Sequence, residues 1–162
     1  MKPTYNKVLI FLILLSSLLA CQEQKNSNHP IILMTEGEEK TIQSRIDTSP
    51  TWNKMHQAIL DECENILKLE PQDRIKVGRR LLGVSREYLR RVFYLSYAYR
   101  MTGDARFATH VEKHLLKASS FTDWNPTHFL DVGEMTMALA IGYDWLYDEI
   151  SDETKKVVRE AM

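Results

Sequence analysis

The sequence lacks the marks of a disulfide scaffold, a metal site and a nucleic-acid-binding protein. It has two cysteines, Cys21 and Cys63, and neither belongs to a cluster with the spacing of a metal knuckle. Basic and acidic side chains nearly balance, at 21 and 22, so the chain has no strong positive charge with which to bind a nucleic acid. We therefore expect no metal, no cofactor and no nucleic-acid partner.

The sequence also lacks an apolar run long enough to cross a membrane as a helix. The run Val8–Ala20 has 13 residues, whereas a spanning helix takes about 20. It follows Lys2 and Lys7, and a short positive region before such a run is typical of a secretory signal peptide. The run leads into the letters L-L-A-C, which resemble a bacterial lipobox. Residues 1–20 are therefore predicted to be a lipoprotein signal peptide.

Cleavage before Cys21 leaves that residue to carry lipid, and each acyl CH₂ buried in a membrane contributes about 0.8 kcal/mol. We predict an exported protein that is anchored through Cys21 in a bacterial outer membrane and faces the periplasm or the cell surface. A plain signal peptide with an incidental cysteine is the alternative. Residues 21–29 are predicted to be a flexible tether, and residues 30–162 to be a single domain.

Strand signals are absent, and helix signals follow one another along the domain. The residues predicted to cap helix starts are Thr35, Ser85, Asp104, Thr127 and Ser151. The predicted helices cover about 35–46, 50–69, 85–102, 104–119 and 128–147, with another from 151. Successive starts from 85 onward are about 19 to 24 residues apart, which predicts an all-α fold of stacked αα-hairpins without the period of tetratricopeptide repeats.

The helix predicted over 50–69 has one apolar face. Trp52, Met55, Ile59, Cys63 and Ile66 keep helical period, which predicts that they share a face turned toward the core.

The last helix has barely begun when the sequence ends at Met162, and no C-cap glycine follows. We therefore expect a truncated chain, the N-terminal fragment of a longer protein.

The predicted helix from about His128 is apolar on nearly every face, which is typical of a buried helix. Its apolar side chains are Phe129, Leu130, Val132, Met135, Met137, Leu139, Ile141 and Leu146. The exceptions are His128, Asp131 and Glu134, all in the first two turns. We predict a buried helix with a polar N-terminal end.

Three segments carry a family resemblance. They read G-R-R-L-L-G-V-S-R-E at 78–87, Y-L-S-Y-A-Y-R-M-T-G-D at 94–104 and W-N-P-T-H-F-L-D-V-G-E-M-T-M-A-L-A-I-G-Y-D-W-L-Y-D at 124–148. These segments resemble heparinase II/III-type polysaccharide lyases, and the resemblance extends from about residue 29 to the end. It implies that the domain is the N-terminal part of an incomplete (α/α) toroid, whose second half and β-sandwich domains would follow.

The resemblance also implies a reaction, the cleavage of uronic-acid-containing glycans by β-elimination, and an acidic polysaccharide as substrate. In the family, the catalytic Asn or His and the Tyr lie beyond the segment that matches Tyr143–Asp148, and a further His comes from the sandwich domain. The sequence ends before them, so we assign no catalytic residue and expect this fragment alone to be inactive. A non-catalytic helical-hairpin module that binds a glycan or a protein is the alternative. A glycoside hydrolase is disfavoured because Asp131 and Glu134, one helical turn apart, do not straddle a bond.

The candidate substrate-binding residues surround the start of the same helix. They are Trp124, Asn125, His128, Asp131 and Glu134. Trp124 could stack on a sugar ring or plug the base of a hairpin, and the polar residues could contact hydroxyls or orient catalytic groups. Alternatively, Asp131 and Glu134 satisfy free backbone N–H groups, with His128 as a hydrogen-bonded core side chain. A metal site is disfavoured because the i, i+3, i+6 spacing rotates the three ligands apart.

Two further groups of charged residues need interpretation. Lys76, Arg79, Arg80, Arg86, Arg90 and Arg91 form a basic cluster. Such a cluster attracts an anionic glycan, although ordinary ion pairing on a solvated face is the favoured interpretation. Asp144 and Asp148 are predicted to bond the turn that follows them.

Overall fold

The computed structural model describes residues 28–162. The predicted signal peptide and the lipidation of Cys21 lie outside the described residues, as does most of the predicted tether. The described chain is helical, which confirms the all-α prediction. None of its helices is both long and apolar enough to cross a membrane.

Six helices make up the described part of the chain. They are α2 (Glu38–Thr48), α3 (Pro50–Ile66), α4 (Leu82–Thr102), α5 (Ala105–Ser119), α6 (Phe129–Trp145) and α7 (Asp152–Ala161). Within residues 28–162, the only β pairing is an isolated bridge between Val77 and Arg80. Two long connections, 67–81 and 120–128, contain no helix.

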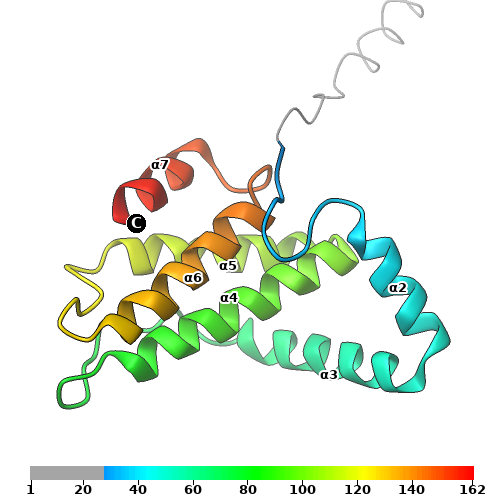
Figure 1. Cartoon of the computed structure of the whole chain (residues 1–162), viewed down its shortest axis with the longest axis horizontal. Coiled ribbons are helices and arrows are strands. Elements are labelled where there is room, and N and C mark those ends of the chain that lie inside the picture. Colours follow the sequence, from blue (N-terminus) through cyan, green and yellow to red (C-terminus); the bar gives the residue numbers. More distant parts are fainter. Residues whose placement is uncertain (1–27) are drawn as a thin grey trace, which may run out of the picture.

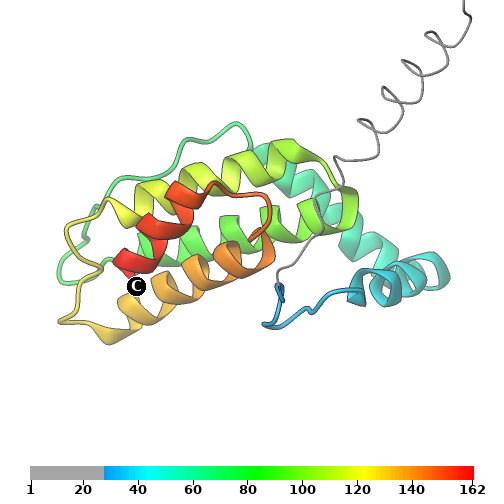
Figure 2. The ribbon, with the colours of Figure 1, turned by 90° about the horizontal axis from the view of Figure 1, so that it is seen from above.

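The helices alternate in direction. In Figure 1 and Figure 2, α4 and α6 lie side by side and run the same way, whereas α3, α5 and α7 run the opposite way. Consequently α4 and α6 begin at the same end of the molecule, where the two long connections also lie. We call this end, made of residues 67–81, 120–128 and the first turns of α4 and α6, the connection end.

Local capping explains some of the helix starts. The Asp104 carboxylate accepts a hydrogen bond from the Arg106 backbone N–H at 3.0 Å, and the Ser151 hydroxyl accepts one from Thr154 N–H at 3.1 Å. Gly103 adopts a left-handed conformation after α4, with φ of 70°. The predicted caps Asp104 and Ser151 are confirmed, because each depends only on residues next to the helix start.

Three predicted helix caps were wrong, at Thr35, Ser85 and Thr127. Thr35 and Glu38 do hydrogen bond to each other, but the helix starts at Glu38 after Gly37. Helix α4 begins at Leu82, three residues before the predicted cap, and Ser85 is buried inside it. Helix α6 begins at Phe129, after His128, and the Thr127 hydroxyl bonds Asn125 rather than a helix N–H.

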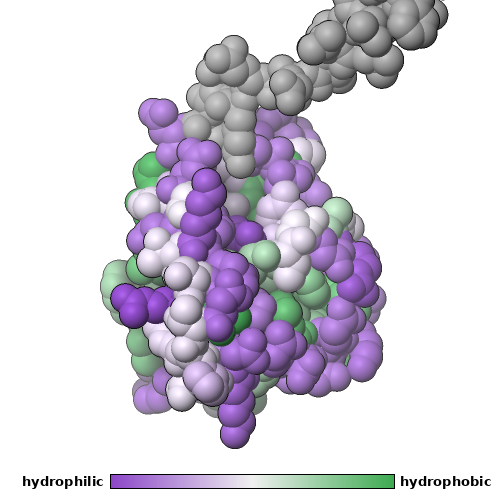
Figure 3. Space-filling view, turned by 90° about the vertical axis from the view of Figure 1, so that its right-hand side faces the viewer, coloured by the Kyte–Doolittle hydropathy of each residue, from purple (hydrophilic) through white to green (hydrophobic). Residues whose placement is uncertain are grey.

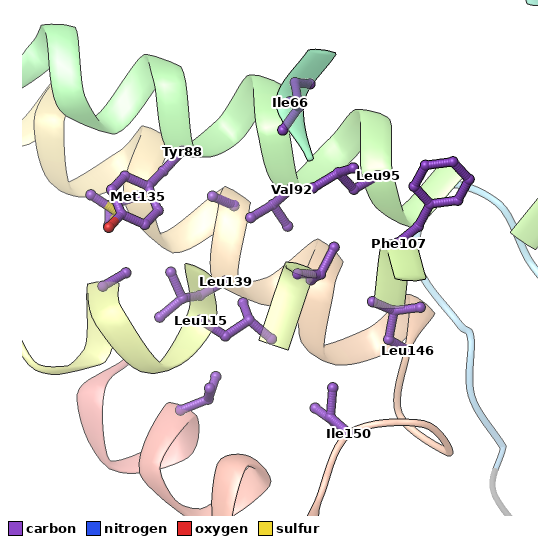
Figure 4. Close-up of a cluster of buried hydrophobic side chains, with 14 of the residues drawn as sticks. Ile66, Tyr88, Val92, Leu95, Phe107, Leu115, Met135, Leu139, Leu146 and Ile150 are labelled. Atoms are coloured by element: carbon purple, nitrogen blue, oxygen red, sulfur yellow. The ribbon is translucent and has the colours of Figure 1, made fainter. Parts of the chain in front are cut away.

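The core lies between α4, α5 and α6. Tyr88, Val92 and Leu95 of α4 face Leu115 of α5 and Met135 and Leu139 of α6 (Figure 4), and all six are almost completely buried. Cys63 and Ile66 at the end of α3 are buried as well, as the helical period predicted.

Two other burial predictions were wrong. Trp52 and Met55 are 47% and 59% exposed, because only the second half of α3 reaches the core. Phe129, Leu130 and Met137 are also exposed, Phe129 by 81%. Helix α6 packs through one face, and no described element covers the other. The prediction of a buried helix from its apolar composition therefore overestimated how much of α6 is buried.

The segment before α2 is anchored to the end of α6. The Asp144 carboxylate accepts the His29 ring N–H at 2.5 Å and the backbone N–H groups of Ile31 and Ile32 at 3.0 Å each. The Trp145 indole donates to the Ile32 carbonyl at 2.9 Å. The expectation that Asp144 bonds the turn after it was therefore wrong, and His29, which was predicted to belong to the tether, is bonded to α6.

Three side chains hold the 67–81 connection against the helices. Tyr88 donates its hydroxyl to the Gln72 carbonyl at 2.7 Å, Arg91 donates to the Glu70 carbonyl at 2.9 Å, and His110 Nε2 lies 3.0 Å from the Leu69 carbonyl. These bonds replace the regular backbone pairing that the connection lacks. Behind them lies His114, fully buried, with its Nε2 unpaired.

We expect opposite effects from alanine at two glycines of α6. A Cβ on Gly142 would lie 2.9 Å from both Leu115 Cδ2 and Val92 Cγ1, whereas a Cβ on Gly133 meets nothing within 4 Å. Gly142→Ala should therefore lower the free energy of unfolding by about 1–3 kcal/mol, and Gly133→Ala should raise it by about 0.5–1 kcal/mol. Urea denaturation followed by circular dichroism measures both, and equal effects would contradict the close packing of α6 on α4 and α5.

We also expect acid to destabilise the fold through His114. Burial lowers the pKa of His114 to about 4, whereas an imidazole in an unfolded chain titrates near 6.5. The folded protein favours the neutral ring. The contribution of His114 to the free energy of unfolding is therefore fully present above about pH 6.5, and about 3 kcal/mol of it is lost as the pH falls toward 4. His114→Phe should flatten this decline in urea titrations across that range. If the free energy of unfolding falls equally with pH in the wild type and in His114→Phe, the loss comes from groups that both proteins share, such as the other buried histidines. That result would refute the assignment to His114.

Candidate functional site

The five predicted site residues gather at the connection end. Trp124 and Asn125 come from the 120–128 connection, His128 directly precedes α6, and Asp131 and Glu134 belong to its first two turns. In Figure 1 this end lies on the left, where α4 and α6 begin. Helix starts carry a partial positive charge, so two parallel helices that begin together favour anions at this end.

The Asp131 carboxylate occupies the centre of the group and has no exposed surface. Its Oδ2 accepts the Leu81 backbone N–H at 2.7 Å and the Asn125 side-chain amide at 2.6 Å, and its Oδ1 lies 2.9 Å from His128 Nδ1. Burial would raise the pKa of Asp131, but these hydrogen bonds together hold it below the ordinary value. Asp131 is therefore an ionised, buried side chain that binds the start of α4 rather than a ligand.

Asn125 connects the two long connections. Its backbone has a left-handed φ of 61°, which asparagine tolerates better than most residues. Its side-chain amide also donates to the Arg79 carbonyl at 2.8 Å, and its Oδ1 accepts from Lys76 Nζ at 3.2 Å. The residue is almost fully buried, and through these bonds it joins the 67–81 connection to the 120–128 connection.

His128 is the candidate residue whose ring remains open to a ligand. A carboxylate only accepts hydrogen bonds, so the Nδ1 that faces Asp131 carries the hydrogen. The other nitrogen, Nε2, has no hydrogen-bond partner within residues 28–162, and the side chain is 27% exposed. In the neutral ring this nitrogen is an acceptor.

Trp124 and Glu134 have different surroundings. Trp124 is buried and its indole donates to the Ala118 carbonyl at 3.0 Å, which places it at the base of the α5–α6 hairpin. Its ring nevertheless borders a hollow of about 450 Å³ between the 120–128 connection, α6 and the end of α7. Glu134 pairs with Arg86 at 3.2 Å, and its second oxygen is buried without a partner.

The predicted basic cluster divides into two parts. Arg86, Arg90 and Arg91 pair with acidic residues of α3, α4 and α6. Arg79 and Arg80 are exposed and make no ion pair in the described chain, and Lys76 bonds only the Asn125 amide. Arg79 and Arg80 belong to a tight turn closed by backbone bonds between Val77 and Arg80, and Lys76 directly precedes this turn. The positive charge without an acidic partner in the described chain therefore lies on the 67–81 connection, which Asn125 joins to Asp131.

A second hollow borders the same end, and a third lies away from it. A space of about 570 Å³ is lined by Pro71, Ile75, Val77 and the start of α4. A separate apolar groove of about 320 Å³ lies between α2, α3 and α4, where Trp52 and Met55 border it. Figure 3 shows apolar atoms recessed between polar ones on that face. None of the five predicted site residues lines this groove.

The arrangement suits the binding of a polar, anionic ligand. No group of three His, Cys, Asp or Glu side chains between residues 28 and 162 has the geometry of a metal site.

The sequence did not indicate that Lys76 and Leu81 contact the candidate site residues. Both reach Asn125 or Asp131 through contacts between residues about 50 positions apart in the sequence.

Removing the Asp131 carboxylate should destabilise the fold. Asp131→Ala leaves the Leu81 N–H and the Asn125 amide without their acceptor, which should cost about 2–4 kcal/mol of unfolding free energy. Glu134→Ala, on the same helix, removes one ion pair with an exposed arginine and should cost less than about 1 kcal/mol. Urea denaturation compares the two variants. Equal losses would show that the connection end does not depend on Asp131.

Comparison with known proteins does not assign the chain to a family. No family model matches the chain, and a search of curated proteins finds no similar sequence. The resemblance to heparinase II/III-type lyases therefore stays a prediction based on the three segments. What the structure contributes is the geometry of the connection end.

Proposed function

We propose that this chain is the opening part of an incomplete (α/α) toroid in a secreted or lipid-anchored polysaccharide lyase that cleaves uronic-acid-containing glycans by β-elimination. The observation that carries the proposal is the connection end. It combines a carboxylate-held imidazole, His128, with three cations that have no acidic partner in the described chain, Lys76, Arg79 and Arg80. An acidic glycan is the ligand that such a surface suits.

The directions of the helices support the toroid. In a toroid of αα-hairpins, inner helices run parallel to one another and outer helices run the opposite way. Here α4 and α6 are parallel and adjacent, and α3, α5 and α7 run against them (Figure 2). Further hairpins that continue the pattern would place more helix starts around the same end, so a groove for a glycan would form there.

The reaction explains why a cationic end is useful. The proton on C5 of a uronate is weakly acidic until the neighbouring carboxylate is neutralised, so positive or hydrogen-bonding groups must bind that carboxylate. A base then takes the C5 proton, the C5–H electrons form the C4=C5 bond, and the C4–O4 bond breaks as an acid protonates O4. The described residues supply binding groups, and the catalytic base and acid would come from later parts of the enzyme.

A second candidate function is a non-catalytic glycan-binding module. The observation that favours it is that Trp124, Asn125 and Asp131 all use their polar atoms within the chain. Such side chains shape a binding surface but do not transfer protons. The two candidates differ in whether the bound glycan is cleaved.

The full-length gene product should generate unsaturated uronate from at least one acidic polymer. Heparin, heparan sulfate, chondroitin sulfate, hyaluronan and alginate are incubated with the protein, and the ultraviolet absorbance of the C4=C5 bond is followed. The same polymers with their carboxylates reduced to alcohols serve as controls and should give no signal, because elimination needs the acidifying carboxyl group. Binding of an acidic polymer without any rise in absorbance would favour the module, and neither binding nor cleavage would refute both candidates.

A further inference from the structure

Four apolar side chains are exposed near the ends of α4 and α6, away from the connection end. They are Ile31 and Leu33, in the segment before α2, and Trp52 and Met55, in the first half of α3. Leu33, Trp52 and Met55 border the apolar groove of about 320 Å³ between α2, α3 and α4. We call these four side chains the apolar patch. Exposed apolar side chains that gather in one place mark contacts with another protein or with a membrane.

The segment before α2 is held with Leu33 at the surface. On one side of Leu33 the Asp144 carboxylate binds two backbone N–H groups, and on the other Arg100 donates to the Thr35 carbonyl at 2.9 Å. Between these bonds Leu33 has a left-handed φ of 58°, which is uncommon for leucine, and its side chain is 66% exposed. The neighbouring Met34 is buried. An exposed leucine on strained backbone points to a contact outside the described chain.

The predicted lipid anchor lies close to the apolar patch in the sequence. Seven residues, 22–28, separate Cys21 from His29. The His29 ring is fixed at the end of α6, where it bonds Asp144 and stacks on Tyr147 with 4.0 Å between ring centroids. An extended chain covers at most about 3.6 Å per residue, so a lipidated Cys21 lies within roughly 30 Å of this ring. The anchor therefore keeps a bilayer at high effective concentration beside the patch, which it does for no other occupant.

We propose that the apolar patch rests on the lipid bilayer that holds Cys21, so that the connection end points away from the membrane. This inference rests on the lipid anchor in the proposed function and not on the lyase chemistry. Tryptophan suits a membrane surface, because its ring is apolar and its N–H is polar. The patch adds a second attachment to the acyl chains, and two attachments fix an orientation that a single tether leaves open.

This orientation has a consequence for the glycan. Helix α4 starts at the connection end and has 21 residues, so at about 1.5 Å per residue its two ends are roughly 30 Å apart. Arg100, which holds the segment before α2, lies in its last turn. In Figure 1 that segment meets the ends of α4 and α6, and the connection end lies on the left. A bilayer against the apolar patch therefore leaves the connection end open to a polymer.

Oxidation by dilute hydrogen peroxide tests the proposal, because a methionine thioether reacts readily only where it meets water. The full-length lipoprotein is reconstituted in vesicles of phosphatidylethanolamine and phosphatidylglycerol. It carries Leu116→Met on α5 as a second reporter, because Leu116 is also exposed and lies outside the patch. The same protein produced without residues 1–21 has no lipid and serves as the reference. Peptide mass spectrometry gives the oxidation rate of each methionine.

Met55 should be oxidised about fivefold or more slowly on the vesicles than in the reference, because the bilayer covers its side chain. The reporter at position 116 should react equally fast in both samples. Met135, which is fully buried, should stay protected in both and so confirms that the protein is folded. The double variant Leu33→Ser, Trp52→Ser should bring the ratio of the two Met55 rates toward one while Cys21 still carries its lipid. Leu69→Ser, which removes an exposed leucine outside the patch, should leave that ratio unchanged.

The outcomes separate this inference from the proposed function. If Cys21 carries lipid and Met55 reacts equally fast in both samples, the orientation is refuted and the lipid anchor stands. Protection of Met55 in the reference would also refute the membrane contact, because another part of the protein would then cover the patch. If mass spectrometry of the N-terminal peptide finds no lipid on Cys21, the anchor in the proposed function fails and this inference fails with it. The ultraviolet assay for unsaturated uronate tests the lyase chemistry separately.

Discussion

A buried carboxylate holds the connection end of this molecule together. Asp131 accepts the backbone N–H at the start of α4, the Asn125 amide and the His128 ring, so one side chain joins α4, α6 and both long connections. An ionised carboxylate without exposed surface is stable only where its oxygens are fully hydrogen bonded. The Asp131 carboxylate meets that condition, and α4 can therefore begin without a cap from its own sequence.

The arrangement separates residues that support the site from residues that can meet a ligand. Asn125 and Trp124 use their polar groups within the chain, whereas His128, Arg79 and Arg80 remain available at the surface. A rigid support of this kind keeps the imidazole in one orientation, which reduces the entropy lost when a ligand binds.

Sequence reasoning succeeded where the determining contacts are local. Asp104 caps α5 through a residue two positions away, so its role could be read from the sequence. It failed for Ser85, because α4 starts earlier with the help of Asp131, about 50 residues distant in sequence. It also failed for Asp144, which bonds a segment more than 110 residues before it. The five candidate residues lie together because they belong to one short stretch of sequence, but burial of Asp131 and exposure of Phe129 follow from packing that periodicity does not reveal.

The central claim is that Asp131 fixes the hydrogen on Nδ1 of His128 and leaves Nε2 free. Long-range proton–nitrogen correlation spectra of ¹⁵N-labelled protein report which ring nitrogen carries the hydrogen in the neutral form. Free imidazole side chains favour hydrogen on Nε2, so this site is predicted to show the less common tautomer, with hydrogen on Nδ1. A His128 signal with hydrogen on Nε2 in the neutral ring would contradict the account, because Nδ1 would then have no hydrogen to donate to Asp131 Oδ1.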